Sequence, residues 1–274
     1  MATPNLDVRR VAGALGAEIL GIDLAASQSD ATIAAIRALL LEHGVIFFRD
    51  QSLDDARLKA FAGRFGAFFR HPYFIPEGDP DVIVIRRAPG DARIVGEDWH
   101  SDTPAIDAPP MASMLYGEDI PPYGGDTLFA NQYLAYDALS PAMQRMIGGL
   151  RAVYDDRRVT AGRNAKSATK LRESARSHGC HPVVRTHPET GRKALYIVRT
   201  LMSHFDGMST AESDGLADYL FAHSHRPEFT CRFRWEPGSV AFWDNRCTQH
   251  SALNDTGPFH RVMRRVQLAG DTPR

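Results

Sequence analysis

A histidine and a carboxylate two residues apart, His100 and Asp102, have the types and the spacing to hold a metal ion. In extended backbone, positions i and i+2 project from the same face, so both side chains could reach one ion. A second imidazole, His250, follows the downstream run WDNRCTQ, just past an expected strand. Two histidines and one carboxylate on one side of a metal leave three positions open, an arrangement typical of non-haem Fe(II) oxygenases.

The same three ligand types could serve other purposes. They could hold zinc that activates water in a metal-dependent hydrolase, or zinc with only a structural role. A structural zinc site normally has a fourth protein ligand, and the sequence shows no evident fourth ligand. A His-x-Asp pair also occurs by chance, with the histidine at the surface beside a polar turn. A ligand-binding protein without turnover is a further alternative, and the complete set of His100, Asp102 and His250 argues against it.

Length and charge describe the protein that must carry these residues. The 274 residues contain no repeat and no low-complexity linker, which predicts a single domain over residues 1–274. Thirty-two Lys and Arg against 33 Asp and Glu leave a formal net charge of −1. This balance favours neither nucleic acid nor an anionic membrane as a partner.

The cysteines and the apolar runs indicate where the protein works. Cys180, Cys231 and Cys247 form no CxxC pair, which argues against a thiolate zinc site and a disulfide framework and favours a reducing cytoplasm. The N-terminal run MATPNLDVRR lacks an apolar core of signal-peptide length, and no apolar run approaches the length of a membrane span. We therefore expect neither export nor a membrane anchor.

Helical patterns surround the segments that could bind the metal. Apolar residues at helical spacing predict helices over four segments: 29–41, 52–65, 133–150 and 209–223. Ser52 with Asp55 predicts the start of the second helix, and Ser209 with Glu212 forms the capping box of the fourth.

Most of the remaining segments read as strands. Alternating or short apolar runs predict strands at 44–48, 81–85, 111–116, 127–130, 183–186, 194–198, 229–235, 239–243 and 262–268. Turn residues at 189–191 and 236–238 predict two hairpins. Many short antiparallel strands with peripheral helices predict a mainly β protein with a double-sheet jelly roll.

Residues 155–177 differ from the rest because they are polar and contain Arg163, Lys166, Lys170 and Arg172. A long polar insertion in a compact domain is either a lid or an ordinary surface loop. We expect a lid that closes over the metal when an anionic substrate binds.

Five motifs stand in one order along the chain: WHSD at 99–102, GGDTLFAN at 124–131, HPVVRTHP at 181–188, WDNR at 243–246 before Gln249-His250, and HRVMRR at 260–265. In this order and spacing they resemble the taurine dioxygenase family of Fe(II)/2-oxoglutarate-dependent oxygenases. The resemblance covers nearly the whole chain. It implies a double-stranded β-helix, a jelly-roll variant, in which His100, Asp102 and His250 bind iron, with 2-oxoglutarate and O2 as cosubstrates.

The last motif supplies cations for two anions. Strict alternation places Arg261, Met263, Arg265 and Gln267 on one strand face, with the two arginines about 13 Å apart at roughly 3.3 Å per residue. The resemblance implies that Arg261 forks onto the distal carboxylate of 2-oxoglutarate and that the Thr127 hydroxyl assists it. It also implies that Arg265 holds the anionic group of the organic substrate, with His71 close by. Arg264, on the opposite face, is expected to be an ordinary solvent-facing residue.

The substrate class is indicated by smaller resemblances. Taurine dioxygenase carries a taurine-contacting asparagine where this chain has Gly96, which argues against taurine. Residues 86–102 and 107–110 are similar to aryloxyalkanoate dioxygenases, while 181–188 and 243–246 are equally similar to alkylsulfatases and taurine oxygenases. We therefore expect hydroxylation of a small organic anion next to a heteroatom. An aryloxyalkanoate ether cleaved to a phenol and a keto acid is favoured, and an alkylsulfonate or alkyl sulfate releasing sulfite or sulfate is the alternative. The oligomeric state is left open, and a homo-oligomer is compatible with the sequence.

Overall fold

The computed structural model describes residues 6–72, 74, 76–155 and 178–274. The expected lid at 155–177, apart from Asp155, lies outside these residues.

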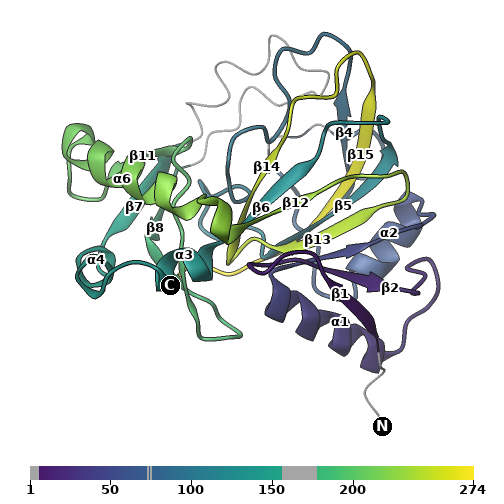
Figure 1. Cartoon of the computed structure of the whole chain (residues 1–274), viewed down its shortest axis with the longest axis horizontal. Coiled ribbons are helices and arrows are strands. Elements are labelled where there is room, and N and C mark those ends of the chain that lie inside the picture. Colours follow the sequence, from purple (N-terminus) through teal and green to yellow (C-terminus); the bar gives the residue numbers. More distant parts are fainter. Residues whose placement is uncertain (1–5, 73, 75, 156–177) are drawn as a thin grey trace.

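A seven-stranded sheet forms one wall of the molecule (Figure 1). In spatial order its strands are β1 (Asp7–Arg10), β2 (Ala17–Leu20), β3 (Val45–Phe48), β13 (Val240–Asp244), β5 (Ala112–Asp119), β15 (Arg261–Leu268) and β4 (Ile83–Arg87). All neighbours are antiparallel except β2 and β3. The central strands β13, β5 and β15 are largely buried, so polar side chains on their buried positions need partners inside the protein.

A three-stranded sheet lies against the large one and completes the sandwich. Its order is β12 (Thr230–Phe233), β6 (Thr127–Asn131) and β14 (Thr248–Ala252). Aromatic rings from both sheets fill the space between them: Phe47 stacks on Phe233 at 4.0 Å, and Phe129 contacts both Phe47 and Trp243. Two packed antiparallel sheets of this kind form the expected jelly roll, and the mainly β fold class is confirmed.

Helices cover the outer face of the large sheet. Helix α1 (Asp30–His43) begins at the expected Ser29, whose hydroxyl accepts a hydrogen bond from the Thr32 amide, and helix α2 (Asp55–Ala62) follows β3. Their buried side chains, such as Ile36 and Phe61, belong to the same apolar cluster as residues on β3 and β13. This cluster attaches α1 and α2 to the outer face of the large sheet, which is the face opposite the small sheet.

A second group of elements extends to the left in Figure 1. It contains α3 (Gln132–Asp137), α4 (Pro141–Ile147), α6 (Thr210–Ser224), the 3-10 turn η1 (Pro227–Phe229), the sheet of β11 (Met202–Phe205), β7 (Arg151–Asp155) and β8 (His178–Pro182), and the hairpin of β9 (Val184–Thr186) and β10 (Lys193–Leu195). A separate apolar cluster joins them. The hairpin at 189–191 and the capping box that begins α6 are confirmed.

Three of the expected elements are wrong in part. The second helix begins at Asp55, because Asp54 and not Ser52 caps it by accepting a hydrogen bond from the Arg57 amide. The helix expected over 133–150 is two helices, because Ser140 caps a new helix whose first residue is a proline. The turn at 236–238 joins no hairpin, since β12 pairs with β6 in the small sheet while β13 pairs with β3 and β5 in the large one.

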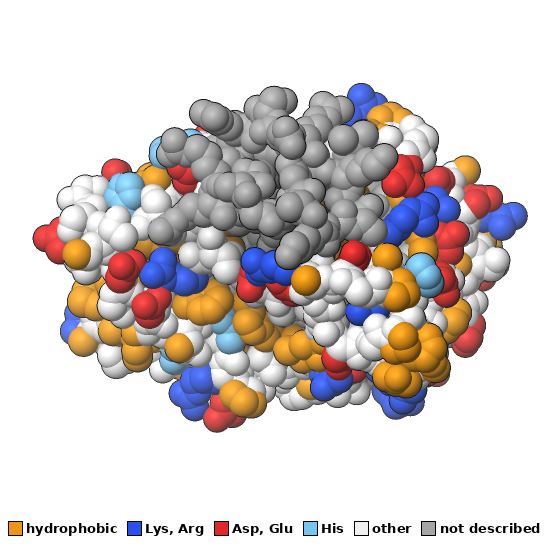
Figure 2. Space-filling view, turned by 90° about the horizontal axis from the view of Figure 1, so that it is seen from above, with side chains coloured by type: hydrophobic (Ala, Val, Ile, Leu, Met, Phe, Trp, Pro, Cys, Tyr) orange, Lys and Arg blue, Asp and Glu red, His pale blue; other side chains and the backbone are white. Residues whose placement is uncertain are grey.

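On the face drawn in Figure 2, acidic and basic side chains of the described residues are interspersed, and neither charge forms a large patch there. This agrees with the formal net charge of −1. Among the described residues, no helix has both the length and the apolar character that a membrane crossing requires.

Candidate metal centre

The backbones of His100 and His250 are tied together by a pair of hydrogen bonds. The amide of His100 donates to the carbonyl of His250 at 3.0 Å, and the amide of His250 donates back at 2.8 Å. His250 lies past β13, as expected, and belongs to the next strand, β14. The two imidazole centroids are 4.2 Å apart, so the bridge presents both rings on the same side.

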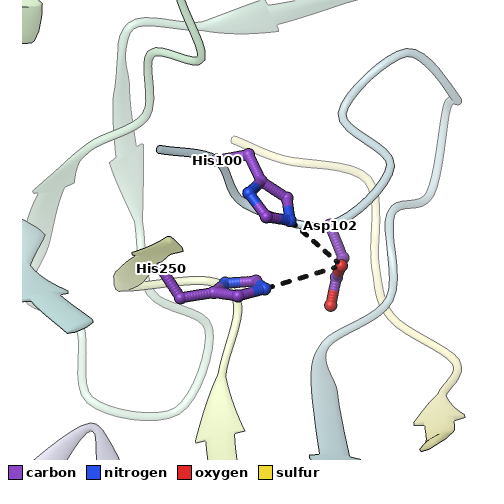
Figure 3. A group of neighbouring side chains, drawn as sticks. All are labelled: His100, Asp102 and His250. Carbon is purple, nitrogen blue, oxygen red and sulfur yellow. Dashed lines mark ion pairs between the residues drawn. The ribbon is translucent and has the colours of Figure 1, made fainter. Parts of the chain in front are cut away.

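Asp102 completes a cluster with these two histidines (Figure 3). Its Oδ1 lies 3.9 Å from Nε2 of His100 and 3.9 Å from Nε2 of His250. The candidate ligand atoms all lie within 4.8 Å of one another, and Asp102 is only 3% exposed. The structure thus brings together the three side chains that the sequence singles out, in an arrangement that can hold one metal ion.

The protonation states also suit a metal. His100 Nδ1 lies 2.7 Å from the carbonyl of Asp98, so it carries the proton and leaves the Nε2 lone pair directed at the cluster. Burial lowers the pKa of His250 well below its usual value. Burial alone would raise the pKa of Asp102, but the positive charge of Arg265 and other neighbours holds it well below its usual range. Neutral imidazoles and an ionised carboxylate are the forms that bind metals.

A second trio of candidate ligands, His187, Asp244 and Cys247, is a structural network instead. His187 Nε2 donates to Asp244 at 3.0 Å, and its Nδ1 accepts from the amides of Glu189 and Thr190. Both ring nitrogens are therefore occupied. Arg246 also donates twice to Asp244, so this carboxylate is satisfied without a metal.

A pocket opens beside the cluster of candidate ligands. Its lining includes His100, His250, Thr127, Arg261 and Arg265. Arg261 is 6% exposed, yet its Nε and Nη2 have no hydrogen-bond partner among the described residues. Burial lowers the pKa of Arg261 to about 10, which leaves the guanidinium charged at neutral pH. Two buried, unpaired donors on a cation fit a ligand carboxylate.

Thr127 is oriented by a residue that sequence reasoning missed. The indole Nε1 of Trp235 donates to Thr127 Oγ1 at 2.9 Å, so the hydroxyl proton of Thr127 is left to serve a ligand. Trp235 also lies near Arg261, whose guanidinium carbon is 5.8 Å from the ring. The tryptophan follows β12 and carries no local signal of this role.

Arg265, on β15, points towards Asp102 of the candidate ligand cluster. Its Nη1 donates to Asp102 Oδ1 at 3.2 Å, and its guanidinium carbon lies 5.1 Å from the Phe74 ring. Burial lowers its pKa, and its Nε has no hydrogen-bond partner among the described residues. Arg264 points the other way and pairs with Glu118 and Asp55, so the expected alternation along this strand is confirmed.

His71 lies close to Arg265 but is not among the residues that line the pocket. Its Nε2 is 3.1 Å from Thr103 Oγ1, and its ring meets Phe74 edge-on with centroids 4.6 Å apart. Burial and the charge of Arg265 lower the pKa of His71 to about 3, so the ring is neutral at physiological pH.

Gly96 forms part of the pocket wall with a φ of +81°. A Cβ added there would lie 3.1 Å from Cε1 of His100. The glycine therefore leaves the edge of one candidate ligand uncovered, and the pocket has no side chain at this point.

Known proteins resemble this chain along almost its full length. Residues 7–267 match the family described as taurine catabolism dioxygenase TauD, TfdA family. An alpha-ketoglutarate-dependent sulfate ester dioxygenase from Pseudomonas putida is 38% identical over 98% of this chain and 91% of its own length. An (S)-phenoxypropionate/alpha-ketoglutarate-dioxygenase from Delftia acidovorans is 31% identical over 97% of this chain and 96% of its own. The crystal structure of a taurine dioxygenase from Burkholderia xenovorans superposes with a TM-score of 0.84 at 38% identity, covering 98% of this chain and 93% of that one.

Proposed function

Because this chain belongs to the taurine catabolism dioxygenase (TauD, TfdA) family and is a 2-oxoglutarate-dependent non-haem iron dioxygenase, we propose that it hydroxylates a small organic anion next to a heteroatom. One observation carries the proposal. His100 and His250 of the largely buried His100, Asp102 and His250 cluster line the same pocket as Arg261, a buried cation whose Nε and Nη2 have no hydrogen-bond partner among the described residues.

His100, Asp102 and His250 would hold Fe(II) through the two Nε2 atoms and one carboxylate oxygen. When bound, Fe(II) with 2-oxoglutarate and O2 supplies the oxidising chemistry, and 2-oxoglutarate leaves as succinate and CO2. The cysteines are unpaired, which suits a reducing cytoplasm in which iron stays ferrous.

Arg261 and Thr127 would hold the distal carboxylate of 2-oxoglutarate. The unpaired Nε and Nη2 of Arg261 can form a charge-assisted pair with it, and Thr127 can donate its hydroxyl proton because Trp235 already fills an acceptor site. Both groups are buried, so this contact would exclude water and would leave the keto acid end free to reach His100, Asp102 and His250.

Arg265 would bind the anionic group of the organic substrate. Its Nη1 donates to Asp102, and its Nε is buried without a hydrogen-bond partner among the described residues. The neutral ring of His71 adds a polar edge near Arg265 without adding charge.

Two substrate classes fit this anion site. A sulfate ester is favoured, because the relative with that activity is 38% identical over nearly the whole chain, whereas the phenoxypropionate relative is 31% identical. The aryloxyalkanoate favoured by the sequence motifs remains the second candidate on the strength of the latter relative. In either case the hydroxylated product is unstable. The hydroxylated carbon becomes a carbonyl and its bond to the ether or ester oxygen breaks, which releases sulfate from an alkyl sulfate or a phenol from an aryl ether.

An aerobic assay of succinate formation tests the proposal. Purified protein is given Fe(II), 2-oxoglutarate and a panel of alkyl sulfates, alkylsulfonates and aryloxyalkanoates, with sulfate, sulfite and phenol measured in parallel. We expect succinate to form together with one of these products, and His100→Ala, Asp102→Ala and His250→Ala to abolish both. Product release without O2 or 2-oxoglutarate would instead identify a metal-dependent hydrolase.

A further inference from the structure

We propose that Ser113 and Asn245 are positioning residues for the metal site, because they hold one oxygen of Asp102 and leave only the other to face the histidines. This inference rests on the metal site proposed above. Neither residue lines the pocket among the described residues, and both act through Asp102.

The two oxygens of Asp102 have different surroundings. Oδ2 accepts a hydrogen bond from Ser113 Oγ at 2.6 Å and another from Asn245 Nδ2 at 3.2 Å. Oδ1 is the atom that lies 3.9 Å from Nε2 of each histidine, and its hydrogen-bond donor is Arg265. The carboxylate therefore cannot rotate about its last bond without breaking two buried hydrogen bonds.

The direction of the Ser113 hydrogen bond is fixed by its neighbours. Ser113 Oγ accepts from Asn245 Nδ2 at 3.1 Å and from Gln267 Nε2 at 3.1 Å. A hydroxyl has two acceptor sites and one proton, so with both acceptor sites filled the proton is directed to Asp102.

The orientation of the Asn245 amide is fixed in the same way. The indole Nε1 of Trp243, which can only donate, lies 2.8 Å from Asn245 Oδ1. This contact identifies the oxygen end of the amide, so the nitrogen end faces Asp102 and Ser113. The Asn245 backbone is held as well: its carbonyl accepts from Ser101 Oγ at 2.7 Å.

These groups come from the buried centre of the large sheet. Ser113 lies on β5, directly opposite Trp243 on β13 and Gln267 on β15. Ser113, Asn245 and Gln267 are at most 1% exposed. The carboxylate is thus held by Ser113 on β5 and by Asn245 in the turn that directly follows β13, whereas Asp102 itself lies in a loop.

The two hydrogen bonds to Oδ2 affect how Asp102 can bind a metal. A carboxylate that offered both oxygens would take a coordination position that the keto acid or O2 needs. With Oδ2 saturated by two donors, Asp102 offers one oxygen, and the remaining positions stay open. Partners of this kind contribute about 10- to 100-fold to metal affinity in metalloproteins.

Metal binding by the apoprotein tests this inference without reference to turnover. Co(II) is titrated into wild type, Ser113→Ala and Asn245→Ala, with affinity measured by chelator competition and coordination followed by visible absorption. We expect each variant to bind Co(II) about 10- to 100-fold more weakly, with an altered Co(II) spectrum. Ser239→Ala is the matched control: Ser239 is also buried and hydrogen-bonded, but it lies directly before β13, at the end away from Asn245, and its replacement should leave both readouts unchanged.

The melting temperature of each apoprotein separates positioning from folding. We expect Ser113→Ala to melt within a few degrees of Ser239→Ala while losing metal affinity. If Ser113→Ala does not fold, Asn245→Ala, which removes the other donor to Oδ2, decides by its Co(II) affinity. A folded Ser113 variant that binds Co(II) with wild-type affinity and spectrum overturns the inference, whereas failure of wild type to bind Co(II) overturns the proposed metal site itself.

Discussion

At the scale of residues, we propose that Arg261 and Arg265 on β15 bind two different anions. We expect Arg261→Ala to raise the KM for 2-oxoglutarate by a factor of about 30 or more, since truncating one partner of a buried charged pair costs about 2 to 5 kcal/mol. Arg265→Ala should instead raise the KM for the organic substrate. Steady-state kinetics at saturating metal measures both constants, with Arg264→Ala, on the solvent side of the same strand, as the control. Equal effects of both variants on both ligands would contradict the assignment.

The sequence predicts some of these residues much better than others. His100 and Asp102 are two apart in the sequence, and Arg261 and Arg265 share a strand face, so local spacing is sufficient to group each pair. Ser113 carries no such signal, because its role depends on pairing between β5, β13 and β15, and that register is set by tertiary structure. Trp235 is missed for the same reason.

At the scale of elements, Asp244 joins the end of β13 to the hairpin of β9 and β10. Arg246→Ala would leave this fully buried carboxylate with His187 as its main partner, and we expect a loss of about 3 to 5 kcal/mol in the free energy of unfolding. Urea denaturation of the apoprotein measures it. Arg264→Ala removes a more exposed arginine with two carboxylate partners and should cost at most about 1 kcal/mol. Similar losses in the two variants would argue against a buried network.

The end of helix α6 predicts a dependence of stability on pH. His225 stacks on Trp99 and bonds Gln249, and burial lowers its pKa to about 4. Between pH 6.5 and about pH 4, His225 is protonated in the unfolded chain but neutral in the folded chain. The contribution of His225 to the free energy of unfolding is therefore fully present above pH 6.5 and is lost as the pH falls towards 4.

The variant His225→Phe keeps an aromatic ring against Trp99 and removes the titration. We expect wild type to lose on the order of 1 to 2 kcal/mol more than this variant between pH 7 and pH 5. Denaturant melts at the two pH values measure the difference. Equal losses would mean that His225 titrates normally in the folded protein.

Element boundaries follow from the sequence only where a local signal decides them. The capping box at Ser209 and the turn at 189–191 are local, and both are confirmed. The turn at 236–238 has the same chemistry, yet it connects strands in different sheets, because partner choice depends on which apolar faces pack together. Short strands such as β7 and β8 have too little pattern of their own to be recognised.

For the whole molecule, we expect the apolar clusters to be sufficient for folding without a metal. Both sheets and the helices on them are joined by buried aliphatic and aromatic side chains, and Arg265 offsets the charge of Asp102. We expect the chelator-treated protein to keep its far-UV circular dichroism at 25 °C and to melt several degrees lower than the protein with Mn(II) and 2-oxoglutarate, by ligand linkage. Loss of the folded signal on chelation would show that the metal is part of the folding core.

The backbone hydrogen bonds between His100 and His250 limit which sequence changes this protein can tolerate during evolution. The two residues come from the two halves of the sequence and meet through one pair of backbone hydrogen bonds. Insertion or deletion of one residue in β14 would turn His250 to the opposite face, since side chains alternate along a strand. Substitutions in the pocket wall, as at Val95, leave the bridge untouched. Descendants of this gene can therefore acquire new substrates by substitution, while the segments that carry the histidines must keep their length.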